Sequence, residues 1–465
     1  MMIVTDWILL IENFLWAFIG IPILFFLATI LTIQSKFAQI RNLPLATKTF
    51  LSIFKKSDKN TTGIPPIKAF FASIGGSVGV GNVVGVCVAV QIGGPGALFW
   101  IWVTAFAGAI VKYAEVYLGI RYRTINTNGE YCGGPMYFLR QAIDRPWISN
   151  VVSILLCLYG VEIFQFSVVA KSVATNMNVD IIWIVTILLG MVMFAGMGGI
   201  RRVGSISSIL IPVFVFLYVG MASWILIQNS DLIPQLFSNV ITSAFNGHAA
   251  IGGFAGGSMI YALSHGVRRG CYSGDIGIGF GAVIHSETSI TIPEKQAILV
   301  FFEIFIDTFL VCTTSVAIVL ATGVWHESID GMMLVQEALG RYFPYMHFFM
   351  PFFLFLVGFA TINAYYSVGL KCADYLMPNK GRGLYQIYAA IVLVVFSFFD
   401  SLIAQSVMAV VGALLLIVNS IGIFMLRKQI SFDFELVDQK NNASQEGSFD
   451  PLKSFSQVRI SNEVI

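Results

Sequence analysis

Hydrophobic residues fill this chain in long runs, and short polar stretches separate one run from the next. A helix needs about 20 apolar residues to cross a bilayer, and runs of that length recur along almost the whole sequence. The alternating ten-residue pattern typical of membrane barrel strands does not occur. The pattern therefore predicts an all-α polytopic membrane protein with about eleven spans, at 7–34, 65–91, 94–122, 147–173, 181–199, 203–228, 240–265, 296–323, 347–376, 386–400 and 403–426.

Lysine and arginine are concentrated in every second connection between these spans. This distribution predicts how the chain is oriented in the membrane. The basic connections are those at 36–59, 121–145, 201–202, 268–269, 371–382 and 427–428. The opposite connections carry almost no positive charge, with Arg341 as the exception. The positive-inside rule then predicts that the N-terminus lies outside and that the C-terminus is cytoplasmic. The expected location is a bacterial cytoplasmic (inner) membrane.

Three regions follow from this layout. We expect an N-terminal membrane helix and basic cytoplasmic loop in residues 1–64, and a ten-helix core in residues 65–426. Residues 427–465 are polar and aperiodic, which predicts a disordered cytoplasmic tail.

Composition removes several other classes of protein. Hydrophobic residues make up 57% of the chain and charged residues 11%, so the lipid bilayer is the expected partner. The net charge of +2 gives no basic surface for nucleic acid. The six cysteines show no paired spacing, so no zinc site or disulfide framework is expected. A monomer suffices for this layout, and the oligomeric state stays open.

Glycine clusters interrupt two of the spans. The second span contains "IGGSVGVGNVVG" at 74–85, and the seventh contains "GGFAGGS" at 252–258. Small residues also serve close packing of membrane helices, but two clusters five spans apart favour another interpretation. Once the first span is set aside, they fall on core helices one and six, which run in opposite directions. We expect a five-plus-five inverted repeat in which two discontinuous helices form a site near the bilayer midplane.

A broken helix offers binding groups of both signs. The half that begins at the break presents N–H groups, so the amides of Gly79, Gly81 and Asn82 suit a carboxylate. The half that ends there presents carbonyl oxygens, around Gly75 and Val78, which suit a small hard cation. Together these groups predict a carrier of a zwitterion and a monovalent cation.

Several motifs carry a resemblance to a known family. They are "GVGNVVGV", "IGGPGALFWIWVTAFAGAIVKYAE", "GGPMYFL", "GGIRRV", "AAIGGFAGGSM", "RRGCYSGDIGIG" and "FEIFIDTFLVCTTSVAIVLATG". In this order, over about 65–425, they resemble the alanine or glycine:cation symporters. That family is similar to the sodium-coupled carriers of the LeuT-type fold. The resemblance implies uptake of alanine or glycine with sodium or sometimes protons, and no other cofactor.

The resemblance also implies roles for single residues. Gln165 matches a glutamine suited to the substrate, and Thr361 matches a threonine whose hydroxyl can complete a sodium shell with Gly75 and Val78. Apart from the resemblance, Phe254 is expected to cover the substrate because it lies between the two glycine pairs of the second cluster, and Gly256 lies in the same expected break.

Departures from the family pattern leave the amino acid, its stereoisomer and the coupling ion open. They are Ser77, Val80, Ser167, Gly274, Asp275 and Tyr365.

Charges inside the spans add further candidates, because ionisable groups at membrane depth are costly. Asp307 is a candidate for a cation-binding or gating role, as is Ser77, and Glu303 lies one turn before Asp307. We expect Lys112 to reach the cytoplasmic interface by snorkelling. Glu162 has no role in this scheme.

Sodium-coupled symport of a small neutral amino acid is the leading hypothesis. A proton-coupled symporter of a different small amino acid is the alternative, and an ion channel is a remote one. No catalytic or metal-ligand motif occurs, so the chain is not expected to be an enzyme.

Overall fold

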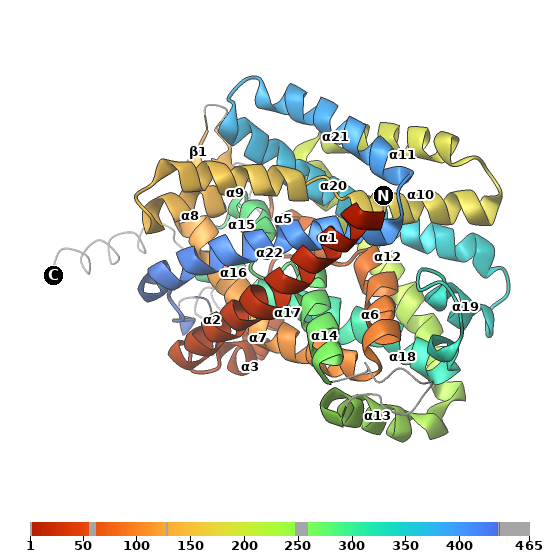
Figure 1. Cartoon of the computed structure of the whole chain (residues 1–465). Coiled ribbons are helices and arrows are strands. Elements are labelled where there is room, and N and C mark those ends of the chain that lie inside the picture. Colours follow the sequence, from red (N-terminus) through yellow and green to blue (C-terminus); the bar gives the residue numbers. More distant parts are fainter. Residues whose placement is uncertain (1, 55–61, 127–128, 247–258, 436, 438–465) are drawn as a thin grey trace.

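The computed structural model describes residues 2–54, 62–126, 129–246, 259–435 and 437, and these are mostly helical (Figure 1). Among them, seven helices are long and apolar enough to cross a membrane, so the chain is an integral membrane protein. The first, Asp6–Gln34, comprises η1 (Leu15–Gly20), α2 (Ile21–Gln34) and the part of α1 (Met2–Phe14) from Asp6 onward. Three others are single helices, α7 (Gly96–Arg121), α12 (Gly199–Gln228) and α20 (Met346–Leu376). The remaining three are Pro146–Met177, which comprises α9 (Pro146–Tyr159) and α10 (Ile163–Met177); Pro293–Thr322, which comprises α16 (Pro293–Ala297), α17 (Leu299–Ile304), the π-helix η4 (Phe305–Cys312) and α18 (Thr313–Thr322); and Ser401–Gln429, which comprises α22 (Ser401–Leu426) and η6 (Arg427–Gln429).

An eighth apolar segment is broken. The helix α5 (Pro66–Ser77) is followed by η2 (Gly81–Gly85) and α6 (Val86–Gly93). The chain bends by 44° between α5 and the segment formed by η2 and α6. Two apolar helices are shorter, α11 (Ile181–Gly196) and α21 (Gly381–Ser397). The remaining elements among the described residues are α3 (Ala38–Arg41), α4 (Leu43–Ser52), β1 (Thr124–Ile125), β2 (Tyr131–Cys132), α8 (Pro135–Ala142), η3 (Ser230–Leu232), α13 (Ile233–Asn246), α14 (Met259–Ser273), α15 (Phe280–Ser286), η5 (Val324–His326) and α19 (Leu334–Gly340).

Each predicted span except the seventh overlaps one of these apolar helices or the bent pair. The seventh span was predicted at 240–265, which covers the end of α13, residues outside the described part of the chain, and only the start of α14. The helix at this place in the order begins at Met259 and includes Arg268 and Arg269. The prediction that these two arginines form a basic connection is therefore wrong. The count of eleven crossings stays a prediction.

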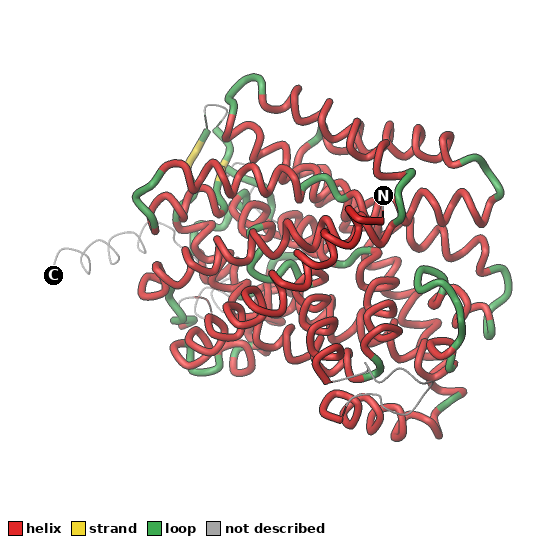
Figure 2. The backbone as a smooth tube through the Cα atoms, viewed as in Figure 1, coloured by secondary structure: helices red, strands yellow, loops and turns green. Residues whose placement is uncertain are grey.

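The helices α14 and α15 pack along α7 and are separated by a second interruption. Glycines permit the close approach: a methyl group added at Gly266 would meet Trp100, and one at Gly270 would meet Thr104. The backbone between α14 and α15 enters the left-handed region at Asp275 (φ 49°) and at Gly277 (φ 72°). Figure 2 shows loops of this kind between helices in the middle of the bundle.

One end of the bundle is joined by contacts between segments far apart in sequence. Just before α5, Ile64 forms a parallel β-bridge with Thr288, just after α15. The Ile64 amide donates to the Glu287 carbonyl (2.8 Å), and the Ser289 amide donates to the Ile64 carbonyl (2.8 Å). The Lys371 ammonium of α20 lies 2.7 Å from Glu287 and 3.3 Å from Glu130, which follows β1.

The start of the predicted tail packs on the helices. The Tyr113 hydroxyl of α7 donates to the Ser431 carbonyl (2.8 Å), and the rings of Phe432 and Phe434 contact the Tyr113 ring. Residues 438–465 lie outside the described part of the chain.

Candidate functional site

At the first break, side chains accept hydrogen bonds from the unwound backbone and so stabilise it. The helix α5 ends at Ser77, and Val78 is extended (φ −78°, ψ 91°). The Gly79 amide donates to the Asn82 side-chain oxygen (3.1 Å), and the Val80 amide donates to the Gln165 side-chain oxygen (2.9 Å). In a region without water these bonds replace those that the helix lost. The predicted unwinding at this segment is confirmed, and Gln165 lies directly against it.

Glycine at position 79 follows from this crowding. A methyl group added there would lie 2.6 Å from the Thr361 hydroxyl and would also collide with the Gln165 side chain. Any larger residue would push these two side chains away from the break.

The oxygens predicted to bind sodium lie together. The Thr361 hydroxyl of α20 is 2.9 Å from the Gly75 carbonyl oxygen and 3.4 Å from the Val78 carbonyl oxygen. Ser77 is different, because its hydroxyl bonds back to the carbonyl oxygens of Ser73 (3.4 Å) and Ile74 (3.5 Å) in its own helix. The structure therefore unites Gly75, Val78 and Thr361 and leaves Ser77 outside that set.

Asp307 is joined to the first break through Asn82. Its carboxylate accepts a hydrogen bond from the Asn82 amide group and a second one from the Thr308 hydroxyl (2.9 Å). Asp307 lies in the π-helix η4 and is 1% exposed. π-Helical turns occur often at functional sites. This geometry places Asp307 beside the break, and its role stays a prediction.

Lys112 points into the protein rather than to the membrane interface. Its ammonium lies 3.4 Å from the Glu303 carboxylate, and both side chains are buried. The Glu303 carboxylate also contacts the His285 ring (2.9 Å) and accepts from the Ser73 hydroxyl (3.0 Å). The prediction that Lys112 snorkels is wrong because a buried carboxylate provides its partner.

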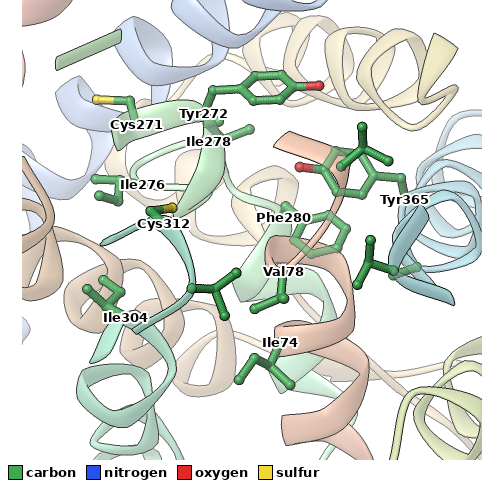
Figure 3. Close-up of a cluster of buried hydrophobic side chains, with 14 of the residues drawn as sticks. Ile74, Val78, Cys271, Tyr272, Ile276, Ile278, Phe280, Ile304, Cys312 and Tyr365 are labelled. Carbon is green, nitrogen blue, oxygen red and sulfur yellow. The ribbon is translucent and has the colours of Figure 1, made fainter. Parts of the chain in front are cut away.

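The second break lies against the first. The Phe280 ring at the start of α15 occupies the space that a side chain at Gly76 would need. Phe280 stacks on Tyr365 of α20, with ring centroids 4.4 Å apart. The Tyr365 hydroxyl in turn donates to the Asp275 carboxylate within the break. Figure 3 shows Phe280 and Tyr365 next to Val78, where α5 ends.

Arg269 of α14 reaches the first break from the other side. Its guanidinium would meet a methyl group added at Gly81 (2.6 Å) and is only 4% exposed. It lies over the Tyr272 ring, 4.9 Å from the centroid. The Tyr272 hydroxyl donates to the Glu162 carboxylate (2.5 Å), which lies between α9 and α10.

A cavity of about 160 Å³ adjoins these residues. Arg269 and Tyr272 line it together with Glu12 and Arg268, which form an ion pair (2.6 Å). Arg269 and Tyr272, which line this cavity, also lie beside Gly81 of the first break.

The positions predicted in the second glycine cluster, including Phe254 and Gly256, lie outside the described residues. Sequence reasoning missed the interruption at 274–279 and the contribution of Arg269, Tyr272 and Glu162. Three glycines at 274, 277 and 279 were the available signal, but the neighbouring arginines ended the predicted span before them.

Comparison with known proteins identifies the family of this chain. The family model described as the sodium:alanine symporter family matches residues 1–451. The sodium/alanine symporter AgcS of Methanococcus maripaludis is 31% identical over 83% of this chain and 86% of its own length. The probable sodium/glutamine symporter GlnT of Bacillus subtilis is 27% identical over 96% of this chain and 94% of its own length.

Two solved structures share the fold at low identity. MhsT in complex with L-phenylalanine has a TM-score of 0.57 at 14% identity and covers 79% of this chain and 90% of its own. A Na⁺-coupled sialic acid symporter has a TM-score of 0.52 at 12% identity and covers 88% of this chain and 86% of its own. Both are transporters of the LeuT-type fold. With a family match across nearly its whole length and relatives of this identity, the chain belongs to the sodium:alanine symporter family.

Proposed function

We propose that this chain is a secondary active symporter that takes up a small neutral amino acid with sodium by alternating access. One observation carries the proposal: two interrupted helices lie side by side, with polar backbone groups and buried polar side chains at the junction. Interrupted helices survive in a membrane where they line a binding site, because a ligand or side chains must satisfy the exposed backbone.

The substrate carboxylate takes the place of side-chain acceptors at the first break. The amides of Gly79 and Val80 now donate to Asn82 and Gln165. A carboxylate is the stronger acceptor at the start of a half-helix, where the dipole is positive. Its arrival releases both side chains to contact the rest of the substrate.

The coupling ion binds beside the substrate, between α5 and α20. The carbonyl oxygens of Gly75 and Val78 and the Thr361 hydroxyl are all oxygen ligands, which hard cations prefer. Sodium bound to these three oxygens holds α20 against the end of α5. Release of the sodium ion loosens the contact between the two helices. This link is how an ion gradient can drive the conformational cycle.

Two relatives are named for transport of alanine and of glutamine. Glycine, or alanine as the L- or D-form, fits this chain because Gly79 is crowded by Gln165 and Thr361. The aromatic rings of Phe280 and Tyr365 further limit the space near the breaks.

The test is uptake of labelled alanine by the purified chain in proteoliposomes with inward gradients of sodium, lithium or choline. We expect uptake with sodium alone and competition by glycine. Replacing Thr361 with valine removes one oxygen and should raise the half-saturating sodium concentration about tenfold or more. Thr186→Val is the control, since Thr186 is exposed on α11 and bonds only its own helix.

Proton coupling is the second candidate, favoured by the buried Lys112, Glu303 and His285 cluster. If a proton gradient without sodium drove as much alanine uptake as a sodium gradient, protons and not sodium would be the coupling ion. Single-channel currents without substrate-dependent charge movement would contradict symport altogether.

We place the chain in a bacterial inner membrane with its N-terminus outside. Without Arg268 and Arg269, the other basic connections still alternate along the chain. Reporter fusions at both termini test this orientation, and a cytoplasmic N-terminus would reverse it.

A further inference from the structure

A buried arginine with unused hydrogen-bond donors lines the cavity of about 160 Å³ that adjoins the first break. Arg269 is 4% exposed, and within the described part of the chain its Nε and Nη2 atoms have no hydrogen-bond partner. A guanidinium keeps its charge in proteins, and a charged donor that is buried without a partner is costly. Arg269 therefore has the capacity to bind an acceptor that enters the cavity.

The geometry of the two free donors selects the kind of acceptor. Nε and Nη2 form one edge of the guanidinium, and their N–H groups are parallel. A carboxylate offers two oxygens at a matching spacing, so it forms a bidentate pair with such an edge. A chloride ion is a single point of charge and gains less from that geometry. The free edge of Arg269 thus favours a carboxylate.

The rest of the Arg269 surroundings leaves this edge available. The guanidinium lies over the rings of Tyr272 and Phe164, 4.9 Å and 5.8 Å from their centroids, and such contacts use its face rather than its edge. The carboxylates nearby are bonded elsewhere. Glu12 forms an ion pair with Arg268 (2.6 Å), and Glu162 accepts from the Tyr272 hydroxyl (2.5 Å).

The cavity also offers an acceptor for an ammonium group. Gln405 of α22 lines it, and the side-chain oxygen of Gln405 is buried without a partner among the described residues. A cavity of about 150 Å³ holds benzene, and alanine has as many non-hydrogen atoms as benzene. A small zwitterion therefore fits this cavity in both size and polar groups.

Four helices build the cavity, and one of them leads to the first break. Its lining comes from α1, α6, α14 and α22, and Figure 1 shows α6 beside α14. Arg269 packs against two glycines of η2: a methyl group added at Gly81 would lie 2.6 Å from its Nη2 atom, and one at Gly85 would collide with the guanidinium. The arginine thus lies between the cavity and the segment whose amides are proposed to bind the substrate.

We propose that this cavity is a second amino-acid site, which the substrate occupies before it reaches the first break. The edge of Arg269 donates to the substrate carboxylate, and the substrate ammonium donates to the Gln405 oxygen. Residues near the starts of α1 and α22 line the cavity, and the proposed orientation places both ends outside. An amino acid that arrives from outside therefore meets this site first. This inference rests on the proposed function, which it deepens.

A structural role for Arg269 makes a different prediction. If the contacts with Tyr272 and Phe164 fully explain this arginine, its replacement changes stability alone. Amino acids would then bind only at the first break, and no ligand would protect the cavity in a protein whose first break is disabled.

The test reports on the cavity when the first break no longer transports. Asn82→Ala is expected to abolish uptake, and Ser406→Cys adds a thiol to the cavity lining. In proteoliposomes of this double variant, alanine should slow the labelling of the new thiol severalfold, relative to Cys157 and by site-resolved mass spectrometry. Protection by alanine that occurs with Ser406→Cys alone and disappears with Asn82→Ala would overturn the second site.

Analogues of alanine separate the two expected contacts without any change at Arg269. Alaninamide lacks the carboxylate and should give no protection. Propionate lacks the ammonium group and should protect only at about tenfold higher concentration. Protection by alaninamide equal to that by alanine, or protection by chloride alone, would overturn the assignment of the cavity to an amino acid.

Uptake kinetics provide a second measurement that needs no added thiol. Arg269→Gln should raise the alanine concentration for half-maximal uptake about tenfold and change the half-saturating sodium concentration little. Arg269→Lys keeps the charge but loses the two-donor edge, so it should restore only part of the affinity. Arg202→Gln is the matched control, because Arg202 is exposed and also lies over a ring, that of Phe194.

The failures of the two proposals are distinguishable. An unchanged alanine dependence in Arg269→Gln overturns the second site and leaves the proposed function standing. No sodium-driven uptake of any small amino acid by the wild type overturns the proposed function itself.

Discussion

Asn82 connects two of the predicted site residues through its two side-chain atoms. Its oxygen accepts from the Gly79 amide, and its nitrogen donates to Asp307. The residue is 0% exposed, so neither group has water as a substitute partner. A change at Asn82 therefore affects the backbone at the break and the carboxylate of η4 together.

Asn82→Ala should abolish sodium-driven uptake of alanine while leaving the protein folded. The change leaves the Gly79 amide and Asp307 without partners, which costs about 1–3 kcal/mol for each buried group. Uptake in proteoliposomes measures the loss, and gel filtration in detergent confirms folding. Asn150→Ala, at an exposed position of α9, is the control.

Gln165→Ala separates substrate contact from backbone support. Removing its side chain frees the Val80 amide, which a substrate carboxylate can still occupy. We expect alanine uptake to fall about tenfold or more, with the half-saturating sodium concentration changed little. If Gln165→Ala raised the half-saturating concentrations of sodium and of alanine by the same factor, that result would contradict a direct role of Gln165 in substrate binding.

The interruption of a helix is a property of the whole segment, not of a single contact. At the first break, α5 ends because Val78 leaves the helical conformation, and the helix resumes with the π-turn η2. Gln165 and Thr361 pack closely against Gly79, and this packing keeps the two half-helices bent relative to each other. The break therefore depends on the absence of a side chain at Gly79.

Gly79→Ala should impair transport even though alanine is the better helix former. The added methyl group would collide with Gln165 and the Thr361 hydroxyl, so both substrate and sodium dependence should weaken. Gly190→Ala on α11 is a matched control, because the structure places nothing within 4 Å of its added methyl group. Uptake at the wild-type level in Gly79→Ala would remove this position from the site.

The two breaks show why sequence reasoning succeeded at one and failed at the other. Glycines in a continuous apolar run identified the first break, because only backbone freedom explains them there. At the second break the run also contains Arg268 and Arg269, and charged residues ordinarily end a span. Their partners come from distant helices, such as Glu12 for Arg268. The contact between Arg269 and the first break depends on the same tertiary packing and has no local signal.

At the level of the whole molecule, ion pairs of Lys371 with Glu130 and Glu287 join separate segments at one end of the bundle. Burial raises the pKa of the Glu287 carboxyl, and the nearby Lys371 ammonium opposes that rise. Acidification therefore protonates Glu287 at a higher pH than an ordinary glutamate. Protonation removes its charge and weakens the pair with Lys371, so this end of the bundle should open more readily as pH falls.

Labelling of Cys132 measures that opening. Cys132 is half-buried and lines a cavity of about 110 Å³ that Glu287 and Lys371 also line. Lys371→Gln should increase the rate of thiol labelling at Cys132 severalfold relative to that at Cys157. In the wild type this ratio should rise as pH falls, and Glu287→Gln should remove that rise, because the ratio corrects for the thiolate fraction that changes with pH at any cysteine. Site-resolved mass spectrometry distinguishes Cys132 from the other cysteines, with Cys157 as the internal reference. A ratio of Cys132 to Cys157 labelling rates that does not rise as pH falls in the wild type would count against this role of Glu287.

The β-bridge between Ile64 and Thr288 has a mechanical consequence for the transport cycle. It fastens the segment that leads into α5 to the segment that leaves α15, through two backbone hydrogen bonds. In the proposed transport cycle we therefore expect α5 and α15 to move together. The expected hinges are the two unwound segments, which are also the segments proposed to bind the substrate and the ion.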